Sequence, residues 1–166
     1  MKTQDTHTIS LLVANKPGVL VRVALVFARR GYNIDSLAVS AVHNPKFSRM
    51  TITAKGDPAT LEQIIKQVKK LIDVIQASEH DPALAVDQEM SLLKVKPSSP
   101  ANKAVIVKHA RAAHAKLLDE TDGVLIFAHA GTSSSLDELE KVMNTYGLLE
   151  MARTGKLLMM KGKETT

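Results

Sequence analysis

The chain of 166 residues contains no cysteine and no tryptophan, and aromatic residues make up only 3% of it. Without cysteine there can be no disulfide, no thiolate metal site and no cysteine nucleophile. The scarcity of aromatic side chains argues against a sheet that stacks on the bases of single-stranded RNA. Any function must therefore come from other side chains or from the backbone.

Long apolar runs are also missing. No stretch approaches the ~18 apolar residues of a membrane span, and the first ten residues, MKTQDTHTIS, lack the basic and apolar regions of a signal peptide. Hydrophobic residues nevertheless make up 45% of the chain, which is enough to build one core or two small ones. We expect a cytoplasmic protein with no membrane partner.

The formal net charge of +5 raises the possibility of nucleic-acid binding. The basic residues are scattered along the chain rather than packed into one block, which is typical of a solvated surface. We therefore expect no nucleic-acid partner. An RNA-binding protein remains an alternative, and a salt-dependent shift on mixing with RNA would support it.

The spacings that position phosphates, zinc or a serine nucleophile are absent, since the chain has no GxGxxG, P-loop, HExxH or GxSxG motif. His109 and His114 lie five residues apart on a predicted helix, which points them about 140° apart and makes a poor metal site. Ser135 and Glu138 have the spacing of a helix capping box. The acidic run 119–123 lies where a hairpin must turn. We expect no catalytic residue, metal site or cofactor in this chain.

Hydrophobic periodicity divides the first half into strand, helix, two strands, helix and strand. Asp57 and Pro58 are typical of a helix start, as N-cap and first helical residue. Asn44 to Phe47 (NPKF) is typical of a turn between two strands. The predicted elements cover residues 8–14, 18–30, 32–43, 48–55, a helix from 58 and 74–78.

The second half repeats this plan at an offset of 75 residues. Glycine recurs at Gly56 and Gly131, and the apolar helix positions recur in the pairs Leu61 and Leu136, Ile64 and Leu139, Val68 and Met143, and Leu71 and Tyr146. We predict strands at 89–96, 148–153 and 156–160, a helix after the break at 97–100, and a hairpin turned at Asp122 and Gly123. The fold class is therefore α+β, with two tandem ferredoxin-like βαββαβ domains at 1–80 and 81–166.

The start of the first helix is unusual because Pro17 and Gly18, poor helix formers, occupy it. Such a start exposes backbone N–H groups at the positive end of the helix dipole, and Gly18 lets a ligand approach the backbone closely. Asn15 and Asn33 add amide groups. A small apolar amino acid fits this chemistry, surrounded by Val13, Leu20, Ile34 and Leu37. From the residues alone, a plain capped loop at Asn15 to Gly18 is equally open.

The chain also contains an ordered series of motifs: NKPGVL, RRGYNIDSL, SRMTI, LEQIIKQ and KLIDVI, followed by EMSLLKV at 89–95 and EMARTGK at 150–156. The series resembles the small, regulatory subunit of acetolactate synthase (acetohydroxyacid synthase), whose first domain is an ACT domain, a module that senses amino acids. The match is strong in the first half and thins out between the motifs at 89–95 and 150–156, including 129–135, where we assign no residue roles. Ala14 departs from the family, which commonly has an acidic residue there.

The resemblance implies a function for the unusual helix start. In this family valine binds between two ACT domains, at positions that match Asn15, Gly18, Asn33 and Ile34. The adjacent Lys16, Pro17, Val19 and Leu20 complete the loop. The chain would form a homodimer and would activate a catalytic large subunit that holds thiamine diphosphate, magnesium and FAD, and valine would reverse the activation. A free-standing ACT sensor with another partner stays an alternative, and the preference among valine, leucine and isoleucine stays open.

Overall fold

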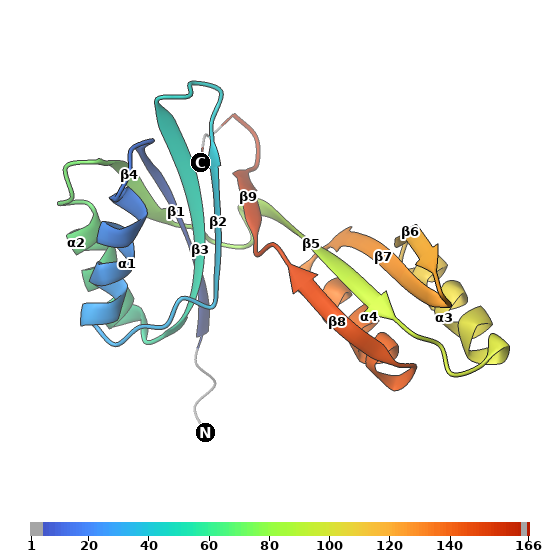
Figure 1. Cartoon of the computed structure of the whole chain (residues 1–166). Helices are drawn as coiled ribbons and strands as arrows, with labels where there is room; N and C mark the ends of the chain where they lie inside the picture. The colour runs from blue at the N-terminus through green and yellow to red at the C-terminus, as the bar shows by residue number, and fades with distance from the viewer. Residues whose placement is uncertain (1–4, 164–165) are drawn as a thin grey trace. The chain divides into compact units, whose positions relative to one another are not determined.

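The computed structural model describes residues 5–163 and 166, and its first half is a four-stranded sheet with two helices on one face (Figure 1). The strands pair in the order β2-β3-β1-β4, and the three pairings are antiparallel. The predicted βαββαβ order is confirmed. Its elements are β1 (Asp5–Ala14), α1 (Val19–Arg29), β2 (Ser36–Ala41), β3 (Phe47–Gly56), α2 (Pro58–Val68) and β4 (Val74–Glu79).

The second half has the same order of elements and the corresponding sheet order, β6-β7-β5-β8. A short further strand, β9 (Leu157–Met160), pairs with β5. The predicted α+β class with two βαββαβ halves is therefore confirmed. Its elements are β5 (Ala85–Val95), α3 (Pro100–Ala112), β6 (Lys116–Thr121), β7 (Val124–Gly131), α4 (Ser133–Thr145) and β8 (Leu148–Arg153).

The sequence repeat corresponds to equivalent positions in the two halves. Gly56 ends β3 and Gly131 ends β7. The apolar positions repeated on α2 and α4 are buried in both helices, and Leu71 and Tyr146 pack against the two cores. In each half the buried helix face packs on the sheet and stabilises the layer of helices. Each half therefore has its own core. The most buried members are Val23, Ile52, Ala54, Leu61 and Ile64 in the first and Leu93, Val95, Ile106, Leu125 and Met143 in the second.

The chain passes between two compact units twice. One unit contains the chain up to Asp87 together with the segment from Gly155 onward, and the other is Gln88–Thr154. Within the first unit the returning tail is held by an ion pair between Lys156 and Asp87 (2.6 Å) and a bond from the Lys161 N–H to the Leu84 carbonyl (3.0 Å). The expected domains, 1–80 and 81–166, stay a prediction, and composition gives no signal of the returning tail.

Three helices begin with a side-chain cap. Asp57 caps α2 by accepting from the Thr60 N–H (2.9 Å), as predicted, and Ser99 caps α3. At α4 the cap is Thr132, which accepts from the Ser135 N–H (3.3 Å). The expected capping box with Ser135 as N-cap is therefore wrong, since the helix starts earlier, at Ser133.

Candidate functional site

The start of α1 differs from the other helix starts. Its N-cap is Gly18, with φ 82° and ψ −10°, and glycine has no side chain with which to cap the helix. The left-handed backbone at this position favours glycine. The first turn contains no acidic residue, so the partial positive charge of the helix start is not offset there. The first N–H groups of α1 are therefore suited to bind an external carboxylate.

Three hydrogen bonds hold the loop before α1 to neighbouring segments of the chain. The Ala14 N–H donates to the Asp73 carbonyl (2.8 Å), and the Asn15 N–H donates to the Lys46 carbonyl (2.8 Å). The side-chain amide of Asn15 donates to the Pro45 carbonyl (3.0 Å). Asn15 therefore positions the loop, while its neighbours Lys16, Pro17 and Gly18 are exposed.

An ion pair also lies beside the helix start. Arg22 follows Gly18 by one helical turn, and its Nη2 lies 2.5 Å from Asp73 Oδ2. A Cβ atom on Gly18 would lie 3.7 Å from Arg22 Nη1, an ordinary contact. Because the Asp73 carbonyl also binds Ala14, Asp73 joins the loop to the first turns of the helix. Periodicity predicts only that Arg22 lies on the solvent-facing side of the helix, and it gives no signal of this pairing.

The second part of the predicted site lies between α1 and β2. Tyr32 anchors this segment through its N–H to the Phe27 carbonyl (3.1 Å) and its hydroxyl to the Asp57 carbonyl. The exposed Asn33 donates from its side-chain amide to Asp35 Oδ1 (3.2 Å). Ile34 is half-buried and packs against the core of the first half.

One chain does not bring the two parts of the predicted site together. Gly18 precedes α1 and Asn33 follows it, and the helix has 11 residues. At 1.5 Å per residue the helix alone separates them by about 16 Å. Figure 1 shows the same arrangement, with the loop before α1 and the segment before β2 at opposite ends of the helix. A single small amino acid can contact both only if the second part comes from another copy.

Several predicted neighbours of a ligand are part of the core. Val13 is 1% exposed and Val19 is 2% exposed, so their side chains pack inside the same half. Leu37 is half-buried against that core. The expectation that Val13 lines the site is therefore wrong, because alternation along β1 turns it towards the helices. Leu20, by contrast, has an exposed side chain (41%).

Helix α1 carries a second apolar stripe outside the core. Leu20, Val21 and Leu25 are exposed by 41%, 61% and 46%, whereas Val23 and Phe27 on the other side are buried. The strand that follows, β2, is at an edge of its sheet. An exposed apolar stripe on a helix is typical of a surface that contacts another protein.

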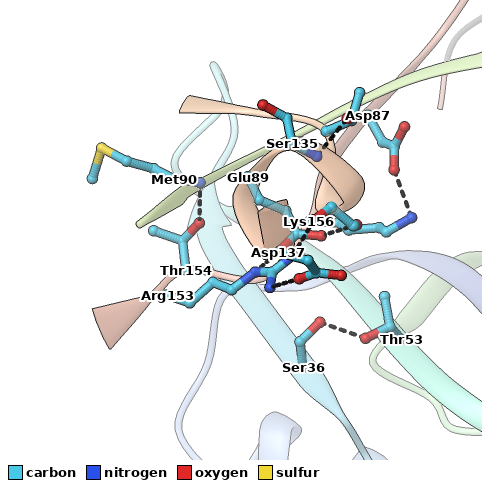
Figure 2. Close-up of polar contacts among 12 residues, drawn as sticks. Ser36, Thr53, Asp87, Glu89, Met90, Ser135, Asp137, Arg153, Thr154 and Lys156 are labelled. Carbon is cyan, nitrogen blue, oxygen red and sulfur yellow. Dashed lines mark hydrogen bonds and ion pairs between the residues drawn. The ribbon is translucent and has the colours of Figure 1, made fainter. Parts of the chain in front are cut away.

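A polar cluster in the second half has no counterpart among the sequence predictions (Figure 2). Glu89 is 7% exposed, accepts from the Ser133 hydroxyl and pairs with Arg153. Arg153 also contacts Asp137 (2.6 Å) and donates to the Ser133 carbonyl (3.3 Å). Burial lowers the pKa of Arg153, but the bonds to Asp137 and Glu89 outweigh it and raise that pKa. Glu89 and Arg153 lie 64 residues apart, so no local sequence signal reveals their pairing.

His129 and Ser135 lie together in the second half, with His129 Nε2 2.8 Å from the Ser135 hydroxyl. Burial lowers the pKa of His129. Across residues 5–163 and 166, no group of three or more His, Cys, Asp or Glu side chains is placed to hold a metal ion. Within the same residues, the helices are too short or too polar to span a bilayer.

Comparisons with known proteins agree across both halves. A family model for the acetohydroxyacid synthase small subunit-like ACT domain matches residues 9–76, and one for the small subunit of acetolactate synthase matches 88–162. The chain is 40% identical to a probable acetolactate synthase small subunit of Methanothermobacter thermautotrophicus, over 97% of this chain and 96% of that protein. It is also 40% identical to the acetolactate synthase small subunit of Mycolicibacterium smegmatis, over 95% and 92%.

A solved structure agrees with these relatives. The crystal structure of the acetolactate synthase small subunit from Thermotoga maritima superposes with a TM-score of 0.87 at 35% identity, and the match covers 96% of this chain and 99% of that one. The fold and the sequence therefore match the same family over nearly the whole length. The chain belongs to the family of acetolactate synthase small subunits, and its first half is an ACT domain.

Proposed function

We propose that this chain is a regulatory subunit that activates the catalytic large subunit of acetolactate synthase and makes it sensitive to valine. Membership of the small-subunit family supports the partnership. The observation that carries the effector site is the start of α1, where Gly18 leaves the helix N–H groups without a side-chain cap. The thiamine diphosphate, magnesium and FAD implied by the family belong to the large subunit.

Each part of valine has a matching chemistry. Its carboxylate binds the N–H groups at the start of α1, where the helix dipole favours negative charge. Its ammonium group binds the amide oxygen of Asn33 and nearby backbone carbonyls. Its isopropyl group packs on the exposed part of Leu20 and on Ile34. Asn15 contributes by holding the loop in place.

The site requires a homodimer, because Gly18 and Asn33 lie at opposite ends of α1 in one chain. A two-fold axis that sets two copies of α1 antiparallel brings the loop of one copy beside Asn33 of the other. The exposed stripe of Leu20, Val21 and Leu25 supplies the apolar contact for such a pair. Two equivalent valine sites follow from the symmetry.

Regulation then follows from differential affinity. Valine can reverse activation only if it binds more tightly to one arrangement of the two ACT domains than to the other. A ligand that contacts both copies meets this condition. If the two ACT domains move relative to each other, the two parts of the site separate and the ligand binds less tightly. The catalytic activity of the large subunit then depends on which arrangement of the ACT domains is present.

The test is acetolactate formation from pyruvate by the large subunit, with and without this chain and with and without valine. The proposal predicts activation by the chain and loss of that activation with valine. Activation without any effect of valine would contradict the effector assignment and keep the partnership. Absence of activation would contradict the regulatory role with this partner.

A further inference from the structure

Gly155 is the residue at which the chain re-enters the first unit, and it lies against Ser36. Ser36 begins β2, the strand that follows the proposed effector residues Asn33 and Ile34. Gly155 has φ +79°, and a Cβ built on it would lie 2.9 Å from Ser36 Cβ and 3.0 Å from Ser36 Oγ. Both residues belong to the first unit. Glycine is required here twice over, by the left-handed backbone and by the close approach to Ser36.

Ser36 is fixed to the body of the sheet. It begins β2 opposite Thr53 in the register of β3, and the two hydroxyls lie 2.5 Å apart (Figure 2). The Asp35 N–H donates to the Thr53 carbonyl (2.9 Å). Asn33 and Ile34 immediately precede Asp35 and Ser36, which both bind Thr53. These bonds therefore resist a displacement of Asn33 or Ile34.

The residues before Gly155 are equally fixed to the second unit. The Thr154 N–H donates to the Met90 carbonyl (3.0 Å), and the Thr154 hydroxyl accepts from the Met90 N–H (3.1 Å). Arg153 is held by Glu89 and Asp137. One peptide bond therefore joins a residue bound to β5 of the second unit to a residue seated against Ser36.

We propose that Gly155 is a positioning residue through which the state of Asn33 and Ile34 is transmitted to the second unit. This inference rests on the proposed function, since it assigns a route to the valine response. Binding of valine at Asn33 and Ile34 fixes the start of β2, and the seat of Gly155 against Ser36 transfers that constraint to Thr154 and Arg153. Such a chain of packed contacts can carry coupling between distant sites.

The experiment uses the complex of the full chain with the large subunit. Gly155→Ala puts a methyl group into Ser36, and Gly162→Ala is the matched control, because Gly162 has a similar φ of +75° with nothing within 4 Å of the added atom. We expect Gly155→Ala to raise the valine concentration for half-inhibition at least about five-fold. Activation without valine stays within about two-fold, and Gly162→Ala changes neither quantity by more than about two-fold.

A second pair of variants covers the case in which Gly155→Ala does not fold. Ser36→Gly removes the side chain against which Gly155 is seated, whereas Ser36→Ala keeps its Cβ and loses only the hydroxyl bond to Thr53. We expect Ser36→Gly to weaken valine inhibition more than Ser36→Ala does, while both bind valine in calorimetry. Adding Ser36→Gly to Gly155→Ala restores part of the valine response.

The experiment separates a failure of the Gly155 proposal from a failure of the proposed function. If wild type is inhibited by valine but Gly155→Ala matches Gly162→Ala, or Ser36→Gly matches Ser36→Ala, the role of Gly155 is overturned and the proposed function stands. If the wild-type chain binds no valine, the proposed function and this inference are both overturned.

Discussion

The two halves of the chain share one plan but begin their first helices differently. In the second half, Ser99 caps α3 by accepting from the Asn102 N–H (3.2 Å), and Pro100 follows as the first helical residue. In the first half, α1 begins at Gly18, which has no side chain to offer. The same position in the repeat therefore has a side-chain cap in one half and none in the other.

The second helix of the second half sharpens this contrast. At the start of α4 the buried carboxylate of Glu89 accepts from the hydroxyl of Ser133, the first residue of the helix. The second half thus supplies an anion to a helix start from its own sequence. At α1 the proposed anion is the carboxylate of valine, which binds reversibly, and this makes the first half suited to sensing.

Removing the internal anion should produce the largest effect on stability. Glu89→Gln leaves Arg153 without its buried ionic partner, and we expect a loss of about 3 kcal/mol in the stability of the second half. Hydrogen exchange of the β5 and β7 amides during denaturant titration measures this loss. The exposed Glu138→Gln on α4 is the control, and equal losses in both variants would contradict a special role for Glu89.

Giving α1 a carboxylate of its own should abolish the response to valine. Gly18→Asp places a negative charge where the ligand carboxylate binds, and we expect the valine concentration for half-inhibition to rise at least about 100-fold. Aspartate tolerates the left-handed backbone better than most residues, and only Arg22 lies within 4 Å of the new Cβ, so the fold should persist. Valine titration of the assembled enzyme is the measurement.

A matched substitution isolates the effect of position. Gly123 in the hairpin between β6 and β7 has φ +74° and open space around it, so Gly123→Asp carries a similar backbone cost in the second half. This variant should keep full valine sensitivity. If Gly18→Asp assembled normally and were as sensitive as Gly123→Asp, the effector site would not be at α1.

Removing the cap of α3 should affect stability alone. Ser99→Ala leaves the Asn102 N–H without its acceptor, which costs about 1 kcal/mol. We expect a small shift in the denaturant midpoint of the second half and no change in half-inhibition by valine. A loss of valine sensitivity in Ser99→Ala would show that the two helix starts are not functionally distinct.

The smallest expected effect is a pH dependence of local stability at the start of α2, where Asp57 is the N-cap. Hydrogen bonds from Thr60 lower the pKa of Asp57 below its ordinary value of 3.8, so the charged cap favours the folded state. This contribution is present above pH 3.8 and is lost as the pH falls through the lowered pKa. The protection factors of the amides at the start of α2, which are corrected for the intrinsic pH dependence of exchange, should therefore fall in acid in wild type. They should fall less in Asp57→Asn, and an equal fall would contradict the assignment.

Much of the fold could be predicted because its signals are local. Apolar periodicity, the Asp57 and Pro58 start of α2 and the turn at Asp122 and Gly123 all lie within a few residues of what they specify. The bounds were less exact, since β5 begins at Ala85 and β2 at Ser36. Ladder pairing with distant strands determines these ends, and neighbouring residues do not encode it.

The candidate site could be predicted only in part. The helix start at Gly18 and the amide groups of Asn15 and Asn33 are visible in the sequence, and the resemblance implies that Asn33 and Ile34 contact the ligand. The pairing of Arg22 with Asp73, 51 residues away, depends on the packed structure. The same holds for the close approach of Gly155 to Ser36.

The most direct test of the central claim is an amide NMR titration of the full chain with valine. We predict that the signals of Val19, Leu20, Asn33 and Ile34 shift together and saturate with one affinity, while those of Ala101 and Asn102 at the start of α3 stay in place. Shifts at the start of α3 without shifts at the start of α1, or saturating shifts confined to another region, would contradict the claim.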